Sequence, residues 1–248
     1  MGKKMLVLTL LLSVAAVSLA TDTPTLLGWW KFDNENSMGY NSVIHTPSYT
    51  SYNVWGGFNM GIGHTGDPNN DGSFDTHGGI GYVFYGGQSP TLLAGLRSTA
   101  ITYDFWVKGR SDMGFMTHEG LVLHGEIGTS GGASVGYANP IVCDINPVSS
   151  PPNGIIAWAN ADEWCIVTKP TSWFNDTFND TWAHVVIKFD YPLRTETITV
   201  NGVLLGSAAV THVYTSPSYV QWYFSISGRT WGDFGWRGEI DDFKIYVP

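Results

Sequence analysis

Short strand-like segments follow one another along almost the whole chain, and this succession limits the fold more than any other feature. Beyond residue 20, no window of a dozen residues keeps the 3.6-residue apolar spacing of a helix. The pattern predicts an all-β chain folded as a sandwich. Eleven segments qualify as strands: Thr25–Asp33, Gly79–Tyr85, Ala100–Lys108, Gly120–His124, Gly154–Ala159, Glu163–Thr168, Trp182–Asp190, Glu196–Asn201, Val203–Ser207, Val220–Ser227 and Gly238–Val247.

The best-defined turn lies within Glu196–Ser207 (ETITVNGVLLGS), where Asn201 and Gly202 separate two strand-like segments. A two-residue type I′ turn needs positive φ at both positions, and Asn followed by Gly adopts it readily. We therefore expect an antiparallel hairpin here.

The other connections are expected to be long and polar. Gly125–Gly136 is rich in Gly and Ser, and Asn146–Asn153 contains three prolines. The repeat FNDTFNDT over Phe174–Thr181 holds two Asn-x-Thr sequons, at Asn175 and Asn179, which matter only if the host glycosylates exported proteins. Otherwise we expect this stretch to be a solvated loop.

The first twenty residues have the pattern of a secretory signal. Lys3 and Lys4 precede an apolar run that ends in the small-residue site Ser18-Leu19-Ala20. The run is shorter than the roughly 20 residues of a membrane-spanning helix, although an uncleaved anchor is the alternative. We expect cleavage after Ala20 and a secreted protein, extracellular or periplasmic. Residues 21–248 show no compositional break and are expected to form one domain.

The charge of the chain argues against two classes of partner. Without Lys3 and Lys4, ten Lys and Arg residues face 21 Asp and Glu residues, a net charge of −11. Such a chain is poorly suited to nucleic acid or to an anionic membrane surface. No later stretch is long and apolar enough for membrane insertion. Neutral polymers or cations suit an acidic surface better.

The chain has two cysteines, Cys143 and Cys165. Export would place them where a disulfide persists, and the loop between them would contribute roughly 3 kcal/mol to stability. We expect this bridge, with two buried free thiols as the alternative. Without a third cysteine or a CxxC pair, a thiolate zinc site is not indicated.

Four segments in order carry a family resemblance: LGWWKFD (27–33), ITYDFWVK (101–108), WAHVVIKFD with TVNGVLLGS (182–207), and GEIDDFKIY (238–246). They resemble the first strand, the central aromatic-x-Trp-Val strand, the Trp-x-His-Val strand with its hairpin, and the closing strand of laminin-G-like, concanavalin A-like jelly rolls of secreted bacterial proteins. The resemblance spans nearly the whole chain after the signal. It implies an all-β, antiparallel jelly-roll β-sandwich.

Alternation assigns faces to two of these strands. In Trp182–Asp190 it places Ala183, Val185, Ile187 and Phe189 in the core, so His184 is expected to be a hydrogen-bonded structural residue. In the closing strand it places Asp241, Phe243, Ile245 and Val247 on the core side, and Ile240, Asp242, Lys244 and Tyr246 on the other.

The closing strand also resembles half of a glycosidase motif. Jelly-roll glycosidases of the laminarinase and carrageenase type carry Glu-x-Asp-x-Glu or Glu-x-Asp-x-x-Glu, because retaining hydrolysis needs a second carboxylate about 5 Å from the first. Here Glu239 and Asp241 are followed by Phe243 and Lys244 at the second glutamate's positions. No phosphate loop of the G-x-x-x-x-G-K-[S/T] type is present either. No catalytic residue is therefore assigned.

Calcium is the cofactor that the sequence suggests, at two places. The resemblance implies a structural ion held by Asp242 of the last strand with help around Asp33. Independently, Asp67–Asp75 (DPNNDGSFD) fits the first half of an oxygen-rich calcium loop through Asp67, Asn69, Asp71 and Asp75. The twelfth position is Gly78 instead of a bidentate acid, so a plain Asn/Asp/Gly turn is the alternative.

Aromatic residues are the remaining candidates for ligand binding. The segment Gly228–Gly238 (GRTWGDFGWRG) gathers four candidate ligand-binding residues, Trp231, Asp233, Phe234 and Trp236. Aromatic faces stack on sugar rings while Asp and Arg bind hydroxyls, but the same loop could simply pack over the end of the sandwich.

The sequence thus predicts a secreted, non-catalytic carbohydrate-binding or cell-surface-binding module. A structural or adhesive envelope protein without sugar specificity is the first alternative. An atypical glycoside hydrolase or lyase is the second.

Overall fold

The computed structural model describes residues 24–33, 40–42, 46–47, 59–67, 69, 71–75, 82–85, 100–112, 119–130, 133–146, 154–160, 163–190, 192–209, 221–226 and 236–248. The expected signal, residues 1–20, lies outside this set.

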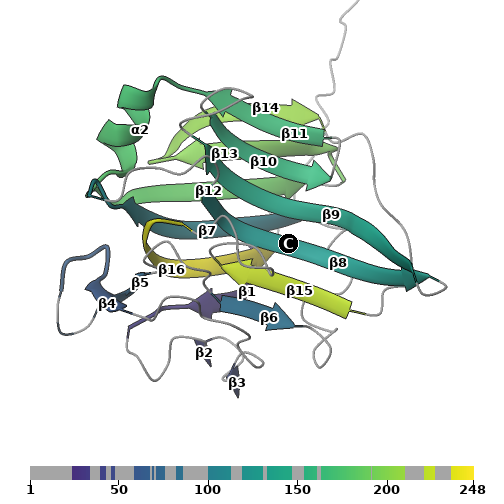
Figure 1. Ribbon diagram of the computed structural model, residues 1–248, viewed down its shortest axis with the longest axis horizontal. Helices are drawn as coiled ribbons and strands as arrows, with labels where there is room; N and C mark the ends of the chain where they lie inside the picture. The colour runs from purple at the N-terminus through teal and green to yellow at the C-terminus, as the bar shows by residue number, and fades with distance from the viewer. Residues whose placement is uncertain are drawn as a thin grey trace, which may run out of the picture.

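Two antiparallel sheets are stacked on each other, as Figure 1 shows. The ten-stranded sheet has the order β14-β13-β12-β7-β16-β1-β2-β3, with β5 pairing β16 and β4 pairing β5. The six-stranded sheet has the order β11-β10-β9-β8-β15-β6. The predicted all-β sandwich is therefore confirmed.

The strands of the first sheet are β1 (Thr25–Trp30), β2 (Tyr40–Asn41), β3 (Thr46–Pro47), β4 (Asn59–Ile62), β5 (Gly72–Asp75), β7 (Ala100–Gly109), β12 (Ala183–Asp190), β13 (Thr195–Val200), β14 (Val203–Ala209) and β16 (Gly238–Val247). Those of the second are β6 (Tyr82–Tyr85), β8 (Glu119–Ser130), β9 (Ala133–Asn146), β10 (Gly154–Asn160), β11 (Glu163–Thr168) and β15 (Gln221–Ile226).

The core lies on one face of the ten-stranded sheet. Residues of β7 alternate between half-buried and buried, and those of β12 do so over most of its length. As predicted, Ala183, Val185, Ile187 and Phe189 are buried. The opposite face of the same sheet, called the outer face below, therefore displays the alternate residues of β7, β12 and β16.

The predicted hairpin is confirmed. Asn201 and Gly202 have φ values of 49° and 75°, which is the left-handed region that a type I′ turn requires. The Asn201 side chain also accepts a hydrogen bond from the His184 backbone amide at 2.8 Å, which ties the turn to β12.

Two expectations about loops are wrong. Gly125–Gly136 was expected to be a loop, but β8 runs to Ser130 and β9 begins at Ala133, so most of it belongs to two paired strands. The Phe174–Thr181 repeat was expected to be a solvated loop, but it contributes to a short helix, α2 (Thr171–Phe178). Phe174 and Phe178, one helical turn apart, are fully buried, and the Phe178 ring meets the buried Trp236 ring edge-on at 6.2 Å. Burial of these two rings holds the helix at one end of the sandwich (Figure 1).

The predicted Cys143–Cys165 disulfide is contradicted. Cys165 is a buried free thiol. Ala157 of β10 pairs with Cys143 of β9 on one side and with Cys165 of β11 on the other. Two strand spacings, roughly 9.5 Å, therefore separate the cysteine Cα atoms, whereas a disulfide needs them within about 7 Å. Burial, followed by the nearby Glu196 carboxylate, raises the pKa of Cys165 to about 11.

Candidate functional site

A β-bulge in the closing strand shapes the outer face. Asp241 of β16 lies opposite Trp106 of β7, and Lys244 lies opposite Asp104, so two residues of β16 face one residue of β7. Asp242 within the bulge has a φ of 48°. Such a bulge breaks strict alternation. Ile240 and Phe243 both enter the core, and the expected placement of Asp241 on the core side, with Ile240 opposite, is wrong.

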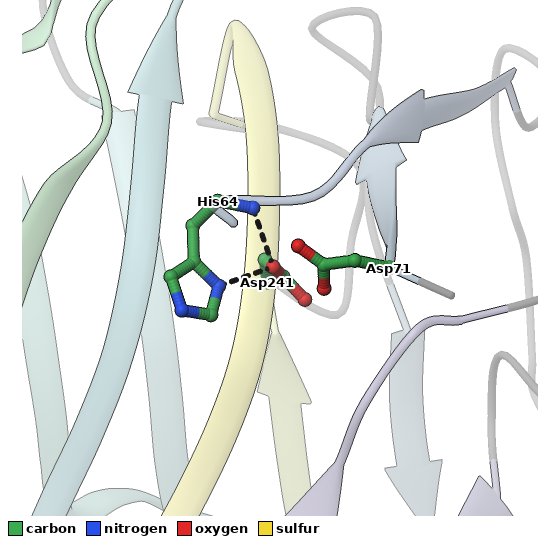
Figure 2. A group of neighbouring side chains, drawn as sticks. All are labelled: His64, Asp71 and Asp241. Carbon is green, nitrogen blue, oxygen red and sulfur yellow. Dashed lines mark hydrogen bonds and ion pairs between the residues drawn. The ribbon is translucent and has the colours of Figure 1, made fainter. Parts of the chain in front are cut away.

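The loop after β4 covers Asp241. The His64 backbone amide donates to Asp241 Oδ2 at 2.9 Å, and His64 Nδ1 lies 2.7 Å from the same oxygen. Asp71, at the end of this loop, points its carboxylate towards Asp241 from the other side (Figure 2). One ligand atom from each of His64, Asp71 and Asp241 lies within 4.8 Å of the others, a grouping that could hold a metal ion.

Four carboxylates influence one another here. Burial is the main cause that raises the pKa of Asp241 to about 6; its hydrogen bonds with His64 oppose this, and the charges of Asp71 and Asp242 add to it. The pKa of Asp33 is also raised, first by burial, with contributions from Asp242 and Asp71 and opposition from Lys31 and the Gly72 amide. Negative charge is therefore concentrated where β1, β16 and the β4–β5 loop meet.

We expect the cation-free protein to lose stability as Asp241 ionises. The pKa of Asp241 is higher in the folded chain (about 6) than its ordinary value of 3.8. The protonated carboxyl therefore contributes its full stability to the folded state below about pH 4, and this contribution is lost as the pH rises through 6. The loss should be on the order of 3 kcal/mol. Urea unfolding in EDTA at several pH values would measure it. Asp241→Asn should flatten the slope of the unfolding free energy against pH between pH 4 and 6. Asp176→Asn, at an exposed position of α2, should leave this slope unchanged. Equal slopes in wild type and Asp241→Asn would contradict the assignment of the pH dependence to Asp241.

The predicted calcium residues separate into two groups. In the first, Asp71 lies beside Asp241. Asp242 lies near enough for its charge to add to the raised pKa values of Asp33 and Asp241, and Asp242 also accepts from the Trp29 indole at 2.5 Å and from Lys244 at 3.2 Å.

The second group does not join them. Asp67 accepts from the Asn69 amide at 2.9 Å in a local turn, and Asp75 pairs with Arg110 at 3.3 Å. The continuous Asp67–Asp75 loop therefore does not direct its four predicted ligands to one point.

A row of stacked rings crosses the outer face beside this cluster. Trp106 of β7 is sandwiched between His64, at a centroid distance of 4.5 Å, and His184 of β12, at 4.8 Å. As predicted, His184 is hydrogen-bonded, with Nε2 lying 2.7 Å from Asp104 Oδ1. Trp182 lies at the end of the row, edge-on to His64 at 6.5 Å, and Lys108 Nζ lies 4.9 Å from the centre of its ring.

A polar pocket of about 290 Å³ is lined by Lys108, Arg110, Ser111, Asp112, Asp180 and Glu239. It adjoins the ring row through Lys108, which lies over the Trp182 ring. Lys108 Nζ pairs with Glu239 at 2.7 Å, and the Arg110 guanidinium donates to Asp112 at 3.0 and 2.8 Å. Ser111 donates its amide and its hydroxyl to Asp180. The pocket is therefore lined by charged groups that already contact one another.

Backbone contacts hold two of the pocket's carboxylates in place. Asp180 has a φ of 52°, and its amide donates to the Gly109 carbonyl at 2.8 Å. Glu239 accepts from the Ser73 hydroxyl at 2.5 Å and lies over Gly61, where a Cβ would come within 2.0 Å of Glu239 Oε2. A side chain at position 61 would thus displace the Glu239 carboxylate.

The predicted sugar platform is not confirmed where the structure describes it. Trp236 is fully buried, and its indole donates to the carbonyls of Lys108 and Glu239, both at 3.3 Å, so it offers no exposed ring. The other three residues of that prediction, Trp231, Asp233 and Phe234, lie outside the described residues.

Sequence reasoning missed the residues that do gather on the outer face. Alternation in Trp182–Asp190 put Trp182 and His184 on the face opposite the core. The same rule applied to β7 would have put Asp104, Trp106 and Lys108 together on one face. What it could not supply was the packing of His64 and Asp180 against them, because both come from distant segments.

Two stacked antiparallel sheets and a closing strand paired with the first define the protein as a concanavalin A-like β-sandwich. The chain belongs to the Laminin_G_3 family, whose model, described as the concanavalin A-like lectin/glucanases superfamily, matches residues 85–247. No curated protein matches the chain as a relative.

Solved structures show the same fold at low sequence identity. Domain 4 of AbnA, a GH43 extracellular arabinanase from Geobacillus stearothermophilus solved in complex with arabinotriose, is 16% identical, with a TM-score of 0.57 over 90% of this chain and 93% of that one. The binding domain of botulinum neurotoxin DC, in complex with rat synaptotagmin II, is 13% identical, with a TM-score of 0.51 over 89% of this chain and 48% of that one. Among the described residues, no helix is long and apolar enough to cross a membrane.

Proposed function

We propose that this chain is an exported module that binds carbohydrate or another cell-surface polymer without catalysing a reaction. The observation that carries the proposal is the polar pocket beside Trp182 at the end of the ring row. A half-buried tryptophan next to charged hydrogen-bonding groups suits a ligand with both apolar C–H faces and hydroxyl groups. Membership of a lectin/glucanase superfamily supports the same class of ligand.

The pocket's carboxylates favour binding over glycoside hydrolysis. Retaining hydrolysis uses two carboxyl groups about 5 to 5.5 Å apart, one as nucleophile and one as a proton donor. Here Glu239 is held by Lys108 and Ser73, Asp112 by Arg110, and Asp180 by Ser111. These contacts suit fixed hydrogen-bond acceptors, so the hydrolase or lyase reading stays the lesser alternative.

We also propose that a calcium ion stabilises the outer face at Asp71 and Asp241, with the charges of Asp33 and Asp242 nearby. Calcium prefers oxygen donors, and Asp71 and Asp241 each offer a carboxylate oxygen, the two lying within 4.8 Å of each other. Imidazole suits other metals better, so His64 is assigned to Asp241 as a hydrogen-bond donor and not to the ion. Burial is the main cause that raises the pKa values of Asp33 and Asp241, and a cation would offset both this burial and the added repulsion from neighbouring carboxylates.

Affinity electrophoresis tests the binding function. The protein is run through gels that contain a panel of neutral and acidic polysaccharides, including arabinan, with calcium or with EDTA. Retardation in at least one polysaccharide gel supports the proposal. Unchanged mobility in every gel would leave the structural or adhesive alternative.

A further inference from the structure

The ligand class of the pocket follows from its charges. Its lining contains two cations, Lys108 and Arg110, and three carboxylates, Asp112, Asp180 and Glu239. Asp75 behind the lining adds a fourth carboxylate, which pairs with Arg110 at 3.3 Å. Negative charge thus exceeds positive charge at the pocket, although two basic residues line it.

Both cations are already engaged by this excess of carboxylates. Lys108 pairs with Glu239 and lies over the Trp182 ring. Arg110 forms ion pairs with both Asp112 and Asp75. An incoming carboxylate would have to compete with these intramolecular partners and would meet the net negative field.

Asp180 provides the acceptor that a hydroxyl-bearing ligand needs. An ionised carboxylate offers about four lone-pair positions. The amide and hydroxyl of Ser111 occupy two of them, one on each oxygen. Because both oxygens accept, one carboxylate can bind two neighbouring hydroxyl groups of a sugar ring.

The size of the site limits the ligand further. A volume of about 290 Å³ is near the lower limit of about 300 Å³ for small-molecule pockets. The pocket therefore fits about one sugar unit.

We infer that this pocket binds a neutral sugar unit through vicinal hydroxyl groups and discriminates against acidic sugars. The inference rests on the proposed glycan-binding function and names its ligand class. Neutral hydroxyls donate to Asp180 and Glu239, whereas a uronate or sialate carboxylate meets the excess of negative charge.

The test uses matched polymers: galactan against polygalacturonate, and glucan against a glucuronate-containing glycan. Dissociation constants of the full chain are measured for each. Neutral polymers should bind at least about tenfold more tightly than their acidic counterparts. Asp180→Asn, which keeps the side-chain shape and tolerates positive φ, should weaken neutral binding by about tenfold or more. Asp176→Asn on α2 makes the same change in charge outside the pocket and should change nothing.

A second variant is expected to gain affinity for acidic polymers, a result that misfolding would not produce. The Asp112 side chain is 63% exposed, so Asp112→Asn should fold normally. This variant removes one of the carboxylates that pair with Arg110. The ratio of affinities for neutral over acidic polymers should therefore fall by several-fold, chiefly because acidic polymers bind more tightly. Melting curves of all variants show that the fold is kept.

The outcomes separate the inference from the proposed function. Preference for acidic polymers, or equal neutral binding by Asp180→Asn and Asp176→Asn, overturns the inference but leaves glycan binding standing. If no polymer in the panel binds to wild type, the proposed function and the inference fall together.

Discussion

Adding calcium to EDTA-treated protein is expected to raise its melting temperature by about 5 to 10 °C. Calcium at a hundred times its dissociation constant contributes about 2.7 kcal/mol to the folded state, and each kcal/mol shifts a chain of this size by roughly 2 to 4 °C. The reason is local: Asp241 is fully buried beside Asp71, and a cation would neutralise both. Differential scanning calorimetry with and without calcium measures the shift.

Two variants locate that effect. Asp241→Asn should abolish the calcium-induced shift, because it removes the buried ligand charge at the centre of the cluster. Asp75→Asn tests the sequence-based loop instead: Asp75 pairs with Arg110 away from the cluster, so the shift should survive this change. A calcium shift that persists in Asp241→Asn and vanishes in Asp75→Asn would restore the Asp67–Asp75 loop as the calcium site.

Replacing Trp182 with alanine is expected to weaken glycan binding by roughly 30-fold. Tryptophan anchors at binding sites commonly contribute 2 kcal/mol or more, and about 1.4 kcal/mol corresponds to a factor of ten. Trp182 lies at the end of the ring row, and Lys108 of the pocket lies over its ring. Dissociation constants for the best-binding neutral polymer measure the loss.

Trp29→Ala is the matched control for that prediction. Trp29 is also half-buried and also lies near lysines, with Lys31 Nζ at 4.2 Å and Lys244 Nζ at 5.0 Å from its ring. Lys244 is five residues along β16 from Glu239, roughly 17 Å by the strand rise. Trp29→Ala should therefore leave affinity nearly unchanged; an equal loss in both variants would move the binding site away from the pocket.

The strands were predictable because their patterns are local. β7 and β12 alternate as their sequences indicate, and Asn201-Gly202 forms the expected turn, since both features depend on neighbours within a few residues. β9 was missed because Gly136 and Pro140 interrupt its pattern, yet pairing with β8 and β10 holds it as a strand. Helix α2 was missed because two buried phenylalanines within one turn are too few to give a helical period.

The site was predictable only in part, because its residues meet through long-range contacts. Asp71 was identified from its loop, but its neighbour Asp241 was assigned to the core, since nothing in the sequence announced the bulge at Asp241 and Asp242. The same limit applies to the cysteines: spacing along the chain permitted a disulfide, whereas strand order places a whole strand between them.

The most direct test of the central claim combines binding and catalysis in one gel. Wild-type protein is run into native gels containing each polysaccharide of the panel, neutral and acidic, and each gel is then assayed for newly formed reducing ends. We predict retardation in at least one gel with no polysaccharide cleaved. Free mobility in every gel, or cleavage along the protein's path, would contradict a non-catalytic glycan-binding module.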